Sequence, residues 1–115
     1  MKRILGAASA AIILLSAADP VAAQSSPSPV VVHIANFAFT PKMVTVAPGQ
    51  TVTFVNDDGE PHTATALDKS FDSAGLDVHD SWRHAFTKPG TYAYFCALHP
   101  MMRGTIVVQA QAGKE

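Results

Sequence analysis

The sequence contains only one cysteine, Cys96, among its 115 residues. A single cysteine cannot close an intramolecular disulfide, and the CxxCH motif that attaches haem covalently requires two. In an oxidising compartment a free thiol is prone to react, whereas a buried or metal-bound thiol is protected. If the protein is exported, Cys96 therefore needs a role other than cross-linking, and metal ligation is one such role.

The chain also lacks an excess of charge of either sign. Its 8 Lys and Arg residues are balanced by 9 Asp and Glu residues, which gives a formal net charge of −1. Proteins that bind nucleic acid concentrate positive charge on one surface, so we expect no nucleic-acid partner. No long segment has the hydrophobic period of an amphipathic helix, and no internal repeat is present, which argues against an all-helical or repeat fold.

The N-terminus has the three-part pattern of a secretory signal peptide. Two basic residues precede an apolar run over residues 4–18, and small residues at 21–23 offer a cleavage site. This run is too short and too rich in alanine for a preferred membrane span. We therefore predict a signal peptide over residues 1–23, a flexible lead-in over 24–29, one domain over 30–110 and a C-terminal tail over 111–115. The mature protein would be periplasmic and free of the membrane; a retained anchor is the alternative.

Seven short segments rich in β-branched and aromatic residues alternate with turn residues. Alternation of side chains in two of them predicts half-buried antiparallel strands, with Phe54 and Phe95 in the core. Residues 67–80 are rich in aspartate and are expected to form a long loop with one helical turn. The pattern predicts an all-β sandwich of about seven to eight strands. The seven segments are 30–34, 43–46, 51–56, 62–66, 81–86, 91–95 and 105–109.

Residues 92–104, YAYFCALHPMMRG, carry Cys96, His99 and Met102 at three-residue intervals. A thiolate, an imidazole and a weak thioether are donors that blue-copper sites combine, together with a second imidazole. His62, in the segment NDDGEPHT, can supply that imidazole. The sequence therefore predicts a copper site formed by these four side chains.

The two motifs resemble those of the cupredoxins, a family of type 1 blue-copper proteins, and are most similar to the amicyanins. The resemblance covers residues 30–109 and rests on PGQTVTFVNDDGEPHT and TYAYFCALHPMMRGTIVV. It implies a Greek-key β-sandwich that holds one copper ion, Cu(II) or Cu(I). By this resemblance His62, Cys96 and His99 form a trigonal plane and Met102 is the axial ligand.

One residue beside the first histidine departs from the family pattern. Thr63 stands where these proteins usually have asparagine. The hydrogen bonds around the thiolate, which tune such a centre, are therefore expected to differ.

The resemblance also implies that the protein is an electron carrier and not an enzyme. Its partners would be transient redox proteins, such as a dehydrogenase and a c-type cytochrome, which a monomer meets through a small, weak interface. An apolar docking patch is expected around the edge of His99. The expected patch residues are Pro61, Leu98, Pro100 and Met101.

A copper carrier that delivers or sequesters the metal has the same ligand set and remains the alternative function. A catalytic Cys96 and His99 pair is disfavoured because no third group is placed to orient a base. Multicopper oxidases need further paired histidines, binuclear copper domains need two cysteines, and structural zinc sites do not use a thioether.

The acidic residues ahead of His62 are expected to form a turn that faces water. Electrostatic steering of a basic partner is the alternative role for this group. The residues concerned are Asp57, Asp58 and Glu60.

Overall fold

The computed structural model describes residues 11–13 and 29–110. The predicted signal peptide apart from residues 11–13, the lead-in over 24–28 and the tail over 111–115 lie outside the described residues. Among the residues that are described, no helix is long and apolar enough to cross a membrane.

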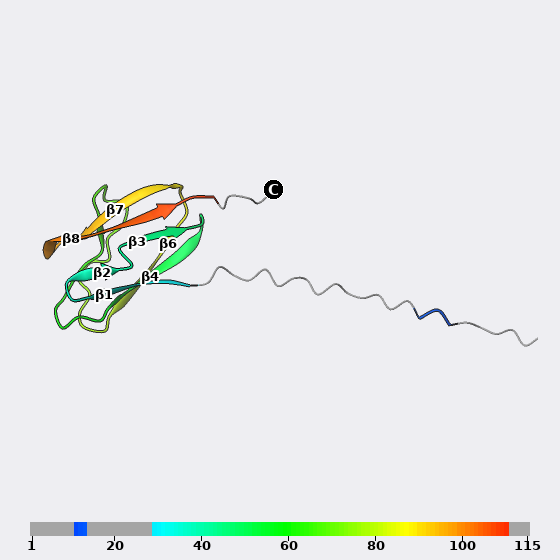
Figure 1. The fold of residues 1–115 in the computed structure, drawn as a ribbon, viewed down its shortest axis with the longest axis horizontal. Coiled ribbons are helices and arrows are strands. Elements are labelled where there is room, and N and C mark those ends of the chain that lie inside the picture. The colour runs from blue at the N-terminus through cyan, green and yellow to red at the C-terminus, as the bar shows by residue number, and fades with distance from the viewer. Residues whose placement is uncertain (1–10, 14–28, 111–115) are drawn as a thin grey trace, which may run out of the picture.

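Two four-stranded sheets face each other and enclose the core (Figure 1). One sheet has the strand order β2-β1-β4-β6, and the other has the order β3-β8-β7-β5. The prediction of an all-β sandwich is confirmed. The strands are β1 (Val30–Ala35), β2 (Ala38–Thr40), β3 (Met43–Val46), β4 (Gln50–Asn56), β5 (Thr65–Ala66), β6 (Ser81–Phe86), β7 (Gly90–Cys96) and β8 (His99–Val108).

Both sheets are mixed, which differs from the predicted antiparallel pairing. β4 is antiparallel to β6 but parallel to β1, with Val32 opposite Phe54. β3 is likewise parallel to β8, whereas β7 and β8 form an antiparallel hairpin. Strands that are joined by a crossover through the other sheet can run parallel, while a short turn forces an antiparallel pair.

Strand lengths also differ from the sequence expectation near the ends of the sheets. β2 was not predicted, β5 is only two residues long, and β8 begins at His99 instead of residue 105. The segment 67–80 has no helical turn. It instead contributes two buried side chains, Phe71 and Leu76, to the core.

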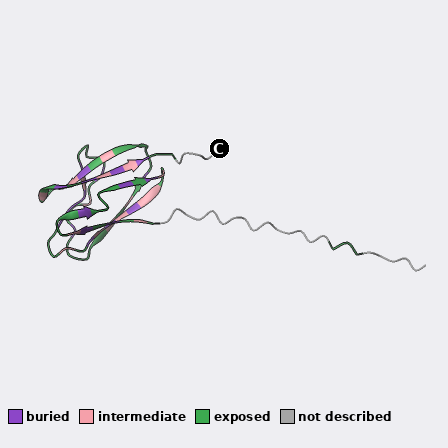
Figure 2. Ribbon diagram, in the orientation of Figure 1, coloured by how far each residue is buried: buried purple, intermediate pink, exposed green. Residues whose placement is uncertain are grey.

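Burial alternates along the central strands, as Figure 2 shows. Phe54 is fully buried as predicted, but the prediction for Phe95 is wrong because this residue is only half-buried. Side chains of a strand alternate between its faces, so Tyr94 and Cys96, both 0% exposed, share the inner face and Phe95 takes the outer one. Burial of Cys96 therefore goes together with burial of Tyr94, and Phe95 between them points away from the core.

Gly104 on β8 lies opposite Tyr94 on β7. A Cβ at this position would collide with the Cζ and hydroxyl oxygen of Tyr94. The glycine thus leaves the space that the tyrosine ring fills, and this close approach anchors β7 against β8 next to the hairpin that carries Cys96.

Candidate metal centre

Three of the predicted ligands meet at one end of the sandwich. The Sγ atom of Cys96 lies 3.7 Å from Nδ1 of His62 and 3.6 Å from Nδ1 of His99, and the two Nδ1 atoms are 3.1 Å apart. Within residues 11–13 and 29–110, this is the only group of three or more His, Cys, Asp or Glu side chains that are close enough to share a metal ion.

The β7–β8 hairpin positions two of these side chains through local geometry. Cys96 ends β7, pairs with His99 at the start of β8, and leaves Ala97 and Leu98 as the turn. A register shift at Phe95 and Cys96 interrupts the regular pairing at this point. Such irregularities redirect side chains near functional sites.

The two adjacent methionines on β8 differ sharply in exposure. Met102 is 5% exposed, whereas Met101 is 92% exposed. Met102 therefore has its thioether inside the protein, and Met101 has its thioether on the surface.

His62 reaches the centre from the segment between β4 and β5 and is fully buried. Its Nε2 atom lies 2.9 Å from Oδ2 of Asp58. A carboxylate acceptor at Nε2 favours the proton on that nitrogen and leaves the lone pair of Nδ1 free for a metal. The Nδ1 atom points toward Cys96, so the tautomer and the orientation agree.

The side chain of Asp58 is only 15% exposed, so the expectation that it faces water is wrong. Its Oδ2 atom also accepts a hydrogen bond from the backbone N–H of Phe37 at 2.9 Å. This backbone hydrogen bond, followed by the interaction with His62, lowers the pKa of Asp58 below its ordinary value. The two neighbouring acidic residues are exposed, in agreement with a turn. They are Asp57 and Glu60.

Asn56 holds the turn that carries this carboxylate. It is fully buried, and its Nδ2 atom donates to the carbonyl oxygens of Glu60 (2.8 Å) and Leu76 (2.9 Å). Its Oδ1 atom accepts from the N–H of Asp58 at 2.9 Å. Because buried polar groups need partners, this side chain defines the path of the chain from β4 to His62.

Thr63 connects the His62 segment to the cysteine in two ways. Its backbone N–H donates to Sγ of Cys96 at 3.3 Å, and its Oγ1 atom accepts from the N–H of Ala97 at 2.8 Å. The same hydroxyl lies 2.8 Å from Oγ1 of Thr65, which donates to Oδ1 of Asp72 at 3.1 Å. The residue that departs from the family pattern thus begins a hydrogen-bonded chain from the ligand loop to the β5 region.

Sequence reasoning missed Phe37, which lies beside the centre. Its ring centroid is 5.3 Å from that of His62 and 5.0 Å from that of His99, with interplanar angles of 86° and 85°. The ring is 48% exposed. An aromatic residue in the two-residue turn after β1 was the available signal, but only the fold brings it to the two histidines.

The donor set fits a copper ion. Two imidazoles, a buried free thiol and a buried thioether combine soft and intermediate donors, which suit copper and not the oxygen-preferring cations. The four residues predicted to form a docking patch are exposed, and each is adjacent in the chain to a predicted ligand. They are Pro61, Leu98, Pro100 and Met101.

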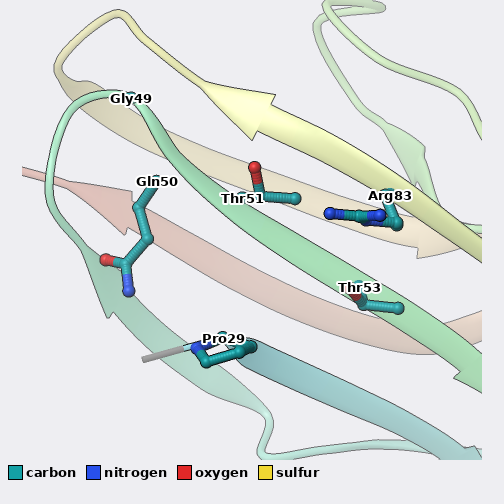
Figure 3. Close-up of a pocket in the computed structure, with 6 residues that line it drawn as sticks. All are labelled: Pro29, Gly49, Gln50, Thr51, Thr53 and Arg83. Carbon is teal, nitrogen blue, oxygen red and sulfur yellow. The ribbon is translucent and has the colours of Figure 1, made fainter. Parts of the chain in front are cut away.

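A surface groove of about 300 Å³ lies at the other end of β4 (Figure 3). It contains the guanidinium of Arg83, threonine hydroxyls and no thiol, imidazole or carboxylate. Its composition gives it no part in the metal centre. The residues that line it are Pro29, Gly49, Gln50, Thr51, Thr53 and Arg83.

Comparisons with known proteins agree with this centre. The sequence matches the model of the cupredoxin-like domain over residues 6–108. It is 31% identical over 103 residues to amicyanin from Paracoccus versutus, which covers 84% of this chain and 78% of that protein. A reduced variant of amicyanin superposes with a TM-score of 0.67 and 29% identity, over 76% of this chain and 88% of that chain.

A copper-containing nitrite reductase from Thermus scotoductus is also similar. It superposes with a TM-score of 0.69 and 34% identity over 75% of this chain. The chain spans 23% of that enzyme, so the likeness concerns one part of it.

Proposed function

The chain belongs to the cupredoxin-like family, and on this basis we propose that it shuttles single electrons between larger redox proteins in the periplasm. It is a blue-copper electron-transfer protein with one copper ion as its cofactor. The observation that carries the proposal is the convergence of one sulfur and two ring nitrogens, all 3.1 to 3.7 Å apart, at one end of the sandwich.

We assign four ligands to the copper: Nδ1 of His62, Sγ of Cys96, Nδ1 of His99 and the thioether of Met102. When bound, the copper supplies a one-electron Cu(II)/Cu(I) couple. Hydrogen bonds from outside the ligand set hold the donors: His62 bonds to Asp58, and the thiolate accepts from a backbone N–H. Donors that are held in this way keep their positions in both oxidation states, which favours fast electron exchange.

His99 is the proposed point of electron entry and exit. His62 and Cys96 are 0% exposed, whereas His99 is only partly buried, so a partner reaches the centre most directly at the edge of His99. The exposed apolar residues Leu98 and Met101, with Pro61 and Pro100, form the proposed docking patch. Such a patch suits transient contact of a monomer with a dehydrogenase or a c-type cytochrome.

The proposed periplasmic location rests on the signal-peptide pattern in residues 1–23. No bond chemistry is proposed, because the similarity to the nitrite reductase covers a fraction of that enzyme. A copper carrier would use the same ligands, so the two functions are distinguished by comparing the rate of copper loss with the rate of electron exchange.

Aerobic reconstitution with Cu(II) tests the ligand assignment. We expect an intense visible thiolate-to-copper absorption that Cys96→Ser removes and that Met43→Leu, a change at an exposed residue outside the ligand set, retains. Absence of the band in the wild-type protein would refute the assignment.

Stopped-flow electron exchange with a c-type cytochrome tests the function. Met101→Lys should slow the exchange without changing the absorption, and Met43→Lys, at a residue that is 64% exposed on β3, is the matched control. Copper loss to a chelator that outpaces electron exchange would instead support the carrier.

A further inference from the structure

We infer that Phe37 is an aromatic cover that holds the two ligand imidazoles and shields the copper from water, and that Asp58 fixes this cover in place. The inference builds on the proposed function, since it concerns the same centre. Phe37 and Asp58 are positioning residues, because they act through His62 and His99.

The ring of Phe37 contacts both imidazoles at once. It meets each of them edge to face, while the imidazoles of His62 and His99 lie 4.8 Å apart at an angle of 55°. Edge-to-face pairs of this kind are favourable beyond the area that they bury. The three rings therefore form one cluster in which rotation of either imidazole must break a contact with Phe37.

The position of Phe37 on the outer side of the cluster explains how His62 is buried so close to the surface. Phe37 is 48% exposed, yet His62 beside it is 0% exposed. Phe37 also borders a shallow groove of about 140 Å³ that Met101 and Met102 help to line. The ring of Phe37 thus lies between solvent and three of the four proposed ligands, namely His62, His99 and Met102.

The backbone at this point is held in an unfavourable conformation. Asn36 and Phe37 have φ values of 53° and 58°, in the left-handed region. Asparagine tolerates this region, but a bulky aromatic residue seldom adopts it. Residues in such conformations persist where surrounding contacts hold them, and they gather at functional sites.

Asp58 supplies the contact that holds this conformation. Its Oδ2 atom accepts hydrogen bonds from both the N–H of Phe37 and Nε2 of His62, each at 2.9 Å. Asn56 in turn fixes the N–H of Asp58. One carboxylate oxygen therefore links the backbone of the cover to the ring of a ligand, so that the cover and the imidazole share one support.

Copper retention in Phe37 variants tests the inference without any redox partner. The reduced, copper-loaded protein is mixed with an excess of a Cu(I) chelator, and the rate of copper transfer is followed. We expect Phe37→Ala to raise this rate by roughly tenfold, because two ring contacts and the shield are lost together. Phe37→Tyr should restore the wild-type rate, and Leu67→Ala, at a residue equally exposed at 48%, should leave it unchanged.

Asp58→Asn provides a second variant that keeps the ring. Its neutral amide oxygen can still face both donors but is a weaker acceptor than the carboxylate oxygen, so we expect copper loss at an intermediate rate, with a changed Cu(II) EPR spectrum and reduction potential. Denaturant unfolding of each apo variant reports whether it folds, and the rates are compared among the folded ones.

Equal transfer rates for Phe37→Ala and Leu67→Ala, or an unchanged EPR spectrum in Asp58→Asn, would overturn the inference. If Phe37→Ala does not fold, the inference is tested by the copper-transfer rates of Asp58→Asn and Leu67→Ala, and equal rates would overturn it. Failure of the proposed function has a different signature, because the wild-type protein would then show the absorption band but exchange no electrons with a cytochrome.

Discussion

Replacement of Thr63 by valine isolates the hydroxyl that takes the place of the usual asparagine. Valine has nearly the same shape, so the substitution removes hydrogen bonds and leaves the packing of this 6% exposed residue close to the original. The N–H of Ala97 loses its acceptor at 2.8 Å, and the hydroxyl of Thr65 loses one of its two partners, at 2.8 Å, while it keeps Asp72. The backbone N–H of Thr63 can still donate to Cys96.

The expected cost follows from these two bonds. Each contributes about 0.5–1.5 kcal/mol net. Ala97 is exposed, so its N–H can donate to water instead, and the total loss of unfolding free energy should be about 1–2 kcal/mol. For a domain of this size each kcal/mol corresponds to about 4–8 °C in the melting temperature. If the ligand loop carries the whole loss, copper affinity should fall by about tenfold.

Thermal unfolding of the apo protein and competitive copper titration of the folded protein measure the two effects. Thr63→Ser keeps the hydroxyl and should behave like the wild type. The visible thiolate absorption should persist in Thr63→Val, because the N–H to sulfur contact belongs to the backbone. Equal stability and affinity of Thr63→Val and Thr63→Ser, or loss of the band in Thr63→Val, would refute this account of the hydroxyl.

Three further perturbations address the stability of the fold. Gly104→Ala should lower the stability of the apo protein by about 1–3 kcal/mol in denaturant, since its Cβ would collide with the buried ring of Tyr94. Gly59→Ala, with no atom within 4 Å of its Cβ, is the control, and equal midpoints for the two variants would contradict the packing argument. Tyr94→Phe should raise stability by about 1 kcal/mol, because the buried hydroxyl has no hydrogen-bond partner among the described residues; a clear loss of stability would show that it has one. Burial lowers the pKa of His84 below its ordinary value of 6.5, so the unfolded chain binds this proton at a higher pH than the native protein does. The unfolding free energy should therefore fall as the pH is lowered from about 7 to about 5, and His84→Phe should weaken this dependence relative to the wild type; parallel pH profiles would contradict it.

The ligand types were predictable because most of them are close in the chain. Cys96, His99 and Met102 lie within seven residues of one hairpin, where a tight turn and strand alternation set their separation. His62 lies 34 residues away from the cysteine, so the donor set that a blue-copper site requires pointed to it, and the resemblance then supported it. Strand positions were mostly predictable for the same reason, since alternation and turn residues act over a few positions.

Other features of the fold depended on which face each strand turns to the core. Phe95 by itself has the character of a core residue, but Cys96 next to it is buried, so Phe95 lies on the opposite, outer face of β7. The parallel pairing of β1 with β4 joins segments on either side of a crossover, which a pattern of alternation within one strand does not encode.

The sequence by itself determined the donor chemistry of this protein, because the soft and imidazole donors and the succession of short strands are local properties. Only the tertiary structure decided what surrounds those donors. Asp58 accepts a hydrogen bond from the N–H of Phe37, 21 residues away in the chain, and Thr63 accepts one from the N–H of Ala97, 34 residues away. Such contacts arise when two sheets pack and bring separate loops to one end, and their partners are chosen by distance in space and not by order in the chain.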